Sequence, residues 1–204
     1  MSQQPPLLEA LHRAVSFLER YGSRCAVVGA VAVGARTEPR FTRDVDLAVS
    51  VASDQEAEQV LGFLLRNGYE LRELFQHERT QEIVTARLVH SDDPDVITDL
   101  LFQTSGIESE VVAVSEVVNV SPDRPVNVAQ VGHLIAMKIF SRSEERPYDQ
   151  ADLVHLMKVA TSDDLKLAEE AVKLIEQRKQ PQDRNLLEEL RELRKGFWPG
   201  QEPG

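Results

Sequence analysis

The sequence lacks a disulfide framework, a long apolar run and a targeting segment. Cys25 is the single cysteine, so no intramolecular disulfide can form, and its place before the apolar residues 26–28 predicts a buried, reduced thiol. The longest near-apolar stretch, residues 25–35, is too short to cross a bilayer and contains two glycines. Residues 1–6 have neither the basic nor the apolar region of a signal peptide. We therefore expect a cytoplasmic protein that does not enter a membrane.

Positive charge is also scarce. The formal net charge is -11, because 34 aspartates and glutamates outnumber 23 lysines and arginines. Such a chain cannot hold nucleic acid by attraction along its whole length, although a local basic patch stays compatible with the composition. The sequence has no His/Cys cluster with the spacing of zinc ligands and no evident Ser/His/Asp set. Carboxylates are therefore the main candidates for chemistry.

The apolar spacing predicts an α/β (α+β) fold, a small mixed sheet flanked by helices. The predicted elements are helices over residues 7–21, 29–34 and 53–66, strands over 25–28, 44–51, 82–90 and 96–102, and a turn at 92–95. The valine-rich stretch 111–120 is ambiguous between helix and strand.

The last part of the chain predicts a helical region. Its predicted helices cover residues 130–142, 148–159, 162–178 and 184–195, with Ser162 at the cap of the third. We therefore expect a core over residues 1–125, a helical region over 126–198 that packs on it, and a frayed tail over 199–204.

Asp44 and Asp46 lie on one predicted strand with a single residue between them. Side chains alternate between the faces of a strand, so both carboxylates point the same way, with α-carbons about 7 Å apart. Mg²⁺ prefers a few carboxylates together with substrate phosphates, and two such ions can stabilise the attacking and leaving oxygens of a phosphoryl or nucleotidyl transfer. Asp99 lies in the apolar strand 96–102, where a charge costs free energy unless it is paired or binds metal. We expect Asp99 to be the third carboxylate of the site.

A glycine turn and a run of arginines precede these carboxylates. Gly29 and Ala30 directly follow the strand 25–28, so backbone amides there can approach a phosphate, and the following helix N-terminus adds partial positive charge. Three arginines follow this turn: Arg36, Arg40 and Arg43. Guanidinium groups suit triphosphate oxygens, although the same residues are also compatible with ordinary loop charges.

In this order the motifs resemble the nucleotidyltransferase (DNA polymerase β-like) superfamily, whose pattern is hydrophobic-Gly-Gly/Ser, then Asp-x-Asp, then a third acidic strand residue. Residues 40–47, Arg-Phe-Thr-Arg-Asp-Val-Asp-Leu, resemble more specifically the Arg-x-Thr-x-Asp-hydrophobic-Asp-Leu of the bacterial AbiEii-like branch. Residues 134–138 and 146–153 are similar to that branch's Leu-x-x-x-Lys and Arg-x-x-Asp-x-x-Asp-Leu helices. The resemblance extends over roughly residues 20–160.

This resemblance implies a Mg²⁺-dependent nucleotidyltransferase that moves an NMP from an NTP to an acceptor hydroxyl. By it, Asp44 and Asp46 would hold two Mg²⁺ ions, and Asp99 would bind metal or act as the base on the acceptor. Gly29 would cradle the phosphates. AbiEii-like proteins are often toxins of toxin–antitoxin pairs, some of which modify tRNA, so an antitoxin partner is expected. The acceptor is open between tRNA, a small molecule and a protein, and the acidity of the chain favours the last two.

The resemblance also assigns residues in the helical region and leaves other functions open. By it, Lys138 would contact the triphosphate and Asp149 would orient the triphosphate or the acceptor. Two positions depart from the branch: Ala30 replaces a glycine or small polar residue, and Tyr148 stands where lysine is common. One alternative is an antibiotic-type adenylyltransferase, whose acidic pocket would suit a cationic aminoglycoside. Another is a non-catalytic nucleotide-binding or interaction member of the fold, which Ala30 favours.

Overall fold

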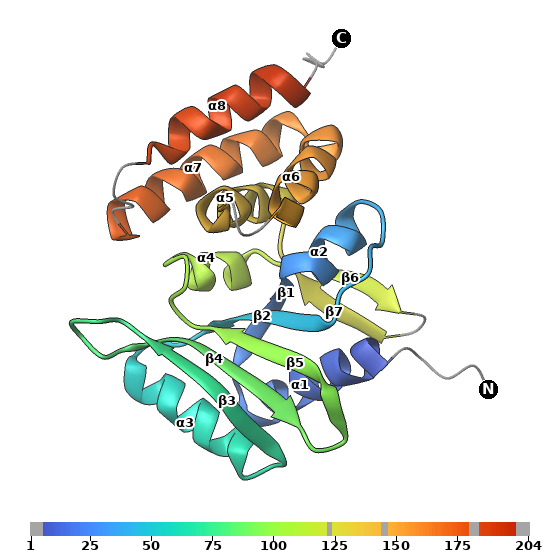
Figure 1. Ribbon diagram of the computed structural model, residues 1–204, viewed down its shortest axis with the longest axis vertical. Coiled ribbons are helices and arrows are strands. Elements are labelled where there is room, and N and C mark those ends of the chain that lie inside the picture. Colours follow the sequence, from blue (N-terminus) through green and yellow to red (C-terminus); the bar gives the residue numbers. More distant parts are fainter. Residues whose placement is uncertain (1–5, 122–123, 144–146, 180–183, 199–204) are drawn as a thin grey trace.

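The computed structural model of the protein describes residues 6–121, 124–143, 147–179 and 184–198 (Figure 1). Within these residues the chain forms eight helices and one seven-stranded mixed sheet. This arrangement confirms the expected α/β class, a mixed sheet flanked by helices and followed by a helical region. The tail over residues 199–204, and Arg146 of the sequence motif, lie outside the described residues.

The sheet has the strand order β3-β4-β5-β2-β1-β7-β6. Its strands are β1 (Arg24–Val28), β2 (Asp44–Ser50), β3 (Tyr69–Gln76), β4 (Ile83–His90), β5 (Asp93–Leu101), β6 (Glu116–Ser121) and β7 (Arg124–Val128). The central strand β2 pairs antiparallel with β1 and parallel with β5. The strand that carries Asp44 and Asp46 therefore has a neighbour on each side, which fixes its register.

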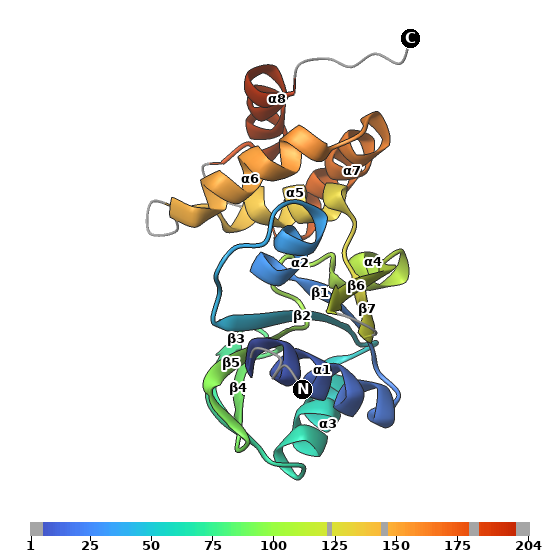
Figure 2. The same cartoon turned by 90° about the vertical axis from the view of Figure 1, so that its right-hand side faces the viewer.

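Helices cover both faces of the sheet. The helices are α1 (Pro6–Tyr21), α2 (Gly29–Arg36), α3 (Asp54–Leu65), α4 (Glu108–Ala113), α5 (Val131–Ser141), α6 (Pro147–Val159), α7 (Ser162–Lys179) and α8 (Leu186–Phe197). Figure 2 shows α1 and α3 on one face, and α2 and α4 on the other, with α5 to α8 stacked beyond them. Within the described residues, no helix is both long and apolar enough to cross a membrane.

The apolar pattern of each helix explains where it packs. In α1 the buried residues Leu11 and Leu18 recur at helical spacing, so one stripe of the helix faces the sheet. In α5 the buried residues Leu134, Ile135 and Ile139 extend around much of the helix, because it lies between α2 on the sheet side and α7 on the other. α5 therefore lies on the same side of the sheet as α2 (Figure 2).

Two strands of the sheet, β3 and β5, differ from the sequence-based prediction. Strand β3 was not expected, because as an edge strand it is exposed along most of its length and carries no clear alternation of apolar residues. The turn expected at residues 92–95 is wrong in its placement. Strand β5 already begins at Asp93 and includes Pro94, which a strand tolerates near its first residue.

The valine-rich stretch divides into two elements. Its first part belongs to α4, and its second part forms β6, which pairs antiparallel with β7. Strand β7 was also not expected, and it spans the position where the sequence predicts the helical region to begin. The N-cap of α7 lies one residue earlier than expected, because the hydroxyl of Thr161 accepts a hydrogen bond from the Asp164 amide at 3.1 Å.

His133 introduces a buried titratable group into α5. The residue is 3% exposed, and its Nδ1 has no hydrogen-bond partner in the described part of the chain. Burial lowers the pKa of His133 from its ordinary value of 6.5 to about 4, against a smaller opposite effect of the Glu110 charge. The folded protein therefore holds this imidazole neutral at pH values where the unfolded chain protonates it.

The stability of the protein should consequently fall as the pH drops from about 6.5 to about 4. In that window the unfolded chain binds a proton at His133 that the folded chain does not. We expect His133→Leu to remove on the order of 3 kcal/mol of this loss. Urea unfolding at a series of pH values measures it, with His77→Gln on an exposed turn as the control. An unchanged pH slope in His133→Leu would contradict this assignment.

Candidate active site

The three predicted carboxylates meet on one face of the sheet. Asp46 on β2 pairs in register with Val28 on β1 and with Asp99 on β5. Register partners on neighbouring strands point to the same side, so Asp46 and Asp99 share a face, and Asp44 shares it by its spacing of two. The structure therefore brings together side chains that are far apart in the sequence.

A cavity of about 700 Å³ lies over this face, between the sheet and α5. Two sequence-predicted site residues do not line it: Asp149, which contacts a lining residue, and Arg36, which donates hydrogen bonds to Val128, Ala129 and Glu116 instead. The predicted residues in the lining are Gly29, Ala30, Arg40, Arg43, Asp44, Asp46, Asp99 and Lys138. The cavity has room for a small-molecule ligand, within the usual size range of such sites.

Gly29 allows Asp46 to approach the backbone at the start of α2. Its φ angle of +62° lies in the left-handed region, and a Cβ built on it would lie 1.9 Å from Oδ2 of Asp46. The N-cap residue Val28 makes no side-chain hydrogen bond to the helix, so the Val28 side chain does not cap the first amides of α2. Gly29 and Ala30 line the cavity, so the positive end of α2 faces a ligand there beside the Asp46 carboxylate.

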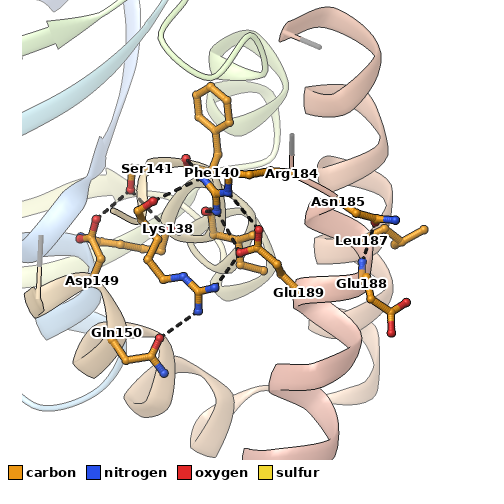
Figure 3. A network of polar contacts seen from close by, with 12 residues as sticks. Lys138, Phe140, Ser141, Asp149, Gln150, Arg184, Asn185, Leu187, Glu188 and Glu189 are labelled. Carbon is orange, nitrogen blue, oxygen red and sulfur yellow. Dashed lines mark hydrogen bonds and ion pairs between the residues drawn. The ribbon is translucent and has the colours of Figure 1, made fainter. Parts of the chain in front are cut away.

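The opposite wall carries a network of buried charges around Lys138. Its Nζ donates to Oδ1 of Asp149 at 2.6 Å and lies 2.9 Å from Oδ2 of Asp152. Ser141 donates to the other oxygen of Asp149 at 3.0 Å, as Figure 3 shows. Lys138 therefore places its ammonium at the cavity wall within a fixed set of partners.

Arg40 belongs to the same network. Its Nε and Nη2 each donate to Asp152 at 2.8 Å, and the Asp152 side chain is almost fully buried. Burial opposes the ionisation of Asp152, but the hydrogen bonds from Arg40 and Lys138 outweigh it and lower the pKa of the carboxyl. Arg40 was expected from the sequence to contact phosphates. In the structure most of its guanidinium faces Asp152, so the contact joins the segment before β2 to α6.

Two exposed aromatic residues stand at the mouth of the cavity, each beside an arginine. Phe41 is 79% exposed, and the guanidinium of Arg43 lies 5.6 Å from its ring centroid. Tyr148 is 70% exposed, with the guanidinium of Arg40 at 5.7 Å from its ring. Tyr148 stands where the resembling family often has lysine, and here it adds an aromatic surface to the rim.

Sequence reasoning missed Arg87, which also lines the cavity. It lies on β4 opposite Asp99, and its Nε and Nη2 each lie 3.0 Å from one oxygen of that carboxylate. Hydrogen bonding to Asp99 is the main cause that raises the pKa of Arg87 above its ordinary value. No local motif marks this residue. Only the register between β4 and β5 could have found it.

The donor set suits a divalent cation at Asp44 and Asp46 better than at all three carboxylates. Both are half-buried, line the cavity and offer oxygen ligands, and the missing side chain at Gly29 makes room for the Asp46 carboxylate itself. In the described part of the chain, no group of three or more His, Cys, Asp or Glu side chains could hold a metal ion. Two carboxylates that share an ion with substrate phosphates therefore fit, and Asp99 is bound by Arg87.

Solved structures that resemble this chain include proteins described as nucleotidyltransferases or nucleotidyltransferase-like. An antigenic nucleotidyltransferase-like protein from Paracoccidioides brasiliensis aligns with a TM-score of 0.52 and 15% identity over 86% of this chain and 89% of that chain. The lincosamide adenylyltransferase LnuA, solved with lincomycin, aligns at 0.46 and 15% identity over 74% and 97% of the two chains. The CCA-adding enzyme of Thermotoga maritima, solved with a tRNA, aligns at 0.39 and 14% identity over 95% and 51%. The first of these confirms the nucleotidyltransferase-like fold.

Residues 16–196 match the model of the family described as nucleotidyl transferase AbiEii toxin, type IV toxin–antitoxin system. The match extends over most of the chain, so the protein belongs to this family. No curated protein matches the sequence. Family and fold together support nucleotidyl transfer as the general reaction class.

The close approach of Gly29 to Asp46 leads to a direct test. We expect Gly29→Ala to lower the free energy of unfolding by about 1–3 kcal/mol, because a Cβ strains the left-handed backbone and displaces Asp46. Binding of a nucleoside triphosphate with Mg²⁺ should weaken at least about tenfold, a loss of roughly 1.4 kcal/mol. Urea unfolding and calorimetric titration measure the two effects.

Gly196→Ala on α8 is the matched control, because a Cβ there meets no atom within 4 Å. It should leave triphosphate binding unchanged. If Gly29→Ala bound the triphosphate as tightly as the wild type, the contact between Gly29 and Asp46 would not form part of the binding site.

Proposed function

We propose that the protein transfers a nucleotidyl group from a nucleoside triphosphate to an acceptor hydroxyl in the cavity between the sheet and α5. The observation that carries this proposal is the position of Asp44, Asp46 and Asp99 on one face, beside the start of α2. Carboxylates next to the positive end of a helix suit a triphosphate with its divalent cation.

Each part of the site has a role in this reaction. Asp44 and Asp46 would hold the divalent cation, which would neutralise charge that develops on the phosphate oxygens. The first amides of α2, next to Gly29, bind phosphate oxygens. Lys138 faces the same ligand from α5, and Asp149 fixes the position of its ammonium through the 2.6 Å contact.

The proposed reaction balances as a substitution at the α-phosphorus. The acceptor oxygen forms a bond to this phosphorus, and the bond from phosphorus to the bridging α,β-oxygen breaks. Pyrophosphate leaves with the electron pair of that bond. Each Asp99 oxygen accepts one hydrogen bond from Arg87 and keeps a second lone pair, and the proton of the acceptor hydroxyl passes to this lone pair on one of them. Asp99 lies next to Asp46 on the neighbouring strand.

The rim of the cavity is where the acceptor would enter. Phe41 and Tyr148 offer exposed aromatic faces there, and Arg43 adds positive charge in a protein that is acidic as a whole. The aromatic faces suit a planar acceptor, and the guanidinium of Arg43 suits an anionic one. The family description further suggests a role as the toxin of a toxin–antitoxin pair, and we include that role in the proposal.

The test is transfer of label from each α-³²P nucleoside triphosphate in the presence of Mg²⁺. The acceptors are total bacterial RNA, an aminoglycoside panel, and the protein alone. We expect Asp44→Asn/Asp46→Asn to lower the rate by at least about 10³-fold, since the cation stabilises the transition state by several kcal/mol. Asp163→Asn, which removes an exposed carboxylate from α7, should keep the wild-type rate.

The outcomes separate the candidate roles. Label on RNA, with growth arrest on expression of the wild type but not of the double variant, supports a toxin. Label on an aminoglycoside, with resistance instead of arrest, supports an antibiotic-modifying enzyme. Binding of triphosphate with Mg²⁺ but no transfer supports a nucleotide-binding module. If the wild type bound no triphosphate with Mg²⁺, the proposed function would be wrong.

A further inference from the structure

Asp99 has a cationic partner on the neighbouring strand β4. Arg87 contacts both of its oxygens, Nε with Oδ1 and Nη2 with Oδ2, each at 3.0 Å. This bidentate geometry is the strongest form of an arginine–carboxylate pair. The Asp99 side chain is 12% exposed, so water competes little for the contact.

Strand β3 holds Arg87 in this position from the other side. The Nη1 of Arg87 donates to Oε2 of Glu73 at 3.3 Å, and the Arg87 guanidinium lies 5.8 Å from the ring centroid of Phe75. Glu73 pairs in register with Arg87 across β3 and β4, next to a register shift between Leu71 and Glu73. The edge strand, whose side chains are otherwise mostly exposed, therefore contributes an acid and an aromatic ring to the support of this arginine.

The result is a row of charges across four neighbouring strands. In strand order the row contains Glu73, Arg87, Asp99 and Asp46, with Arg87 between two acids. A second divalent cation between Asp46 and Asp99 would have to approach a guanidinium that already occupies both Asp99 oxygens. Like charges at such short distances repel strongly where water is partly excluded.

We propose that Arg87 takes the place of a second metal ion, so that the site binds one divalent cation, on Asp44 and Asp46. Arg87 is then a positioning residue. It fixes Asp99 next to Asp46, keeps it free of metal and supplies the positive charge that a second cation would bring. This inference rests on the proposed function for the cation at Asp44 and Asp46. The family resemblance implies two Mg²⁺ ions, and this inference replaces them with one ion and the guanidinium of Arg87.

The test counts bound Mn²⁺ with the full chain, from the electron paramagnetic resonance signal of the free ion during titration. We expect one ion per wild-type chain and none in Asp44→Asn/Asp46→Asn. Arg87→Gln should bind a second ion, because it frees both Asp99 oxygens. Arg87→Gln/Asp99→Asn should bind one again, which assigns the second ion to Asp99. Arg87→Lys keeps a positive charge beside Asp99 and should also bind one.

Arg72→Gln is the matched control, because it removes the same charge from the same hairpin at an exposed pair with Glu70. It should still bind one ion, and far-ultraviolet circular dichroism checks that each variant is folded. Two ions in the wild type, one ion in folded Arg87→Gln, or a second ion that persists without Asp99 would each overturn the inference but not the proposed function. No ion bound by the wild type would overturn the inference as well, whereas failure to bind a triphosphate with Mg²⁺ would overturn the proposed function.

Discussion

The position of the helical region over the sheet depends on the buried charge of Asp152. Asp152 lies on α6 and is fully buried. It accepts hydrogen bonds from Arg40, which lies in the segment before β2, and its Oδ2 is 2.9 Å from the Nζ of Lys138 on α5. An isolated carboxylate at this depth would cost far more free energy than the fold can supply, so both cations must stay in place. One side chain thereby joins the sheet, α5 and α6, and the cavity lies between the parts that it joins.

This constraint gives the cavity two chemically different walls. The sheet wall presents Asp44 and Asp46, whereas the helical wall presents Lys138, which is held by Asp149 and Asp152. A triphosphate with a divalent cation carries both signs of charge and matches both walls. Asp99 belongs to neither set, because its partner Arg87 comes from β4, and this difference separates the roles of the three carboxylates.

The sequence predicted the structure well where the spacing of residues within one strand or one helix determines it. The spacing of Asp44 and Asp46 placed both on one face without knowledge of the sheet, and helical spacing located α5 and α6 closely. The contact between Asp99 and Arg87 depends on strand register, which no local pattern encodes. Strand β3 was missed for a related reason, since an exposed edge strand buries too little to leave a clear alternation. The pairing of Arg40 with Asp152 was not predicted, because no local pattern reveals a partner so distant in the sequence.

The most direct test of this account is a crystal structure with Mn²⁺ and a non-hydrolysable nucleoside triphosphate analogue, with the ion located by anomalous diffraction. The account requires the triphosphate in the cavity beside Gly29, with one Mn²⁺ on Asp44 and Asp46 and with Arg87 still paired to Asp99. A triphosphate bound elsewhere, or Mn²⁺ held by residues other than Asp44 and Asp46, would contradict the central claim.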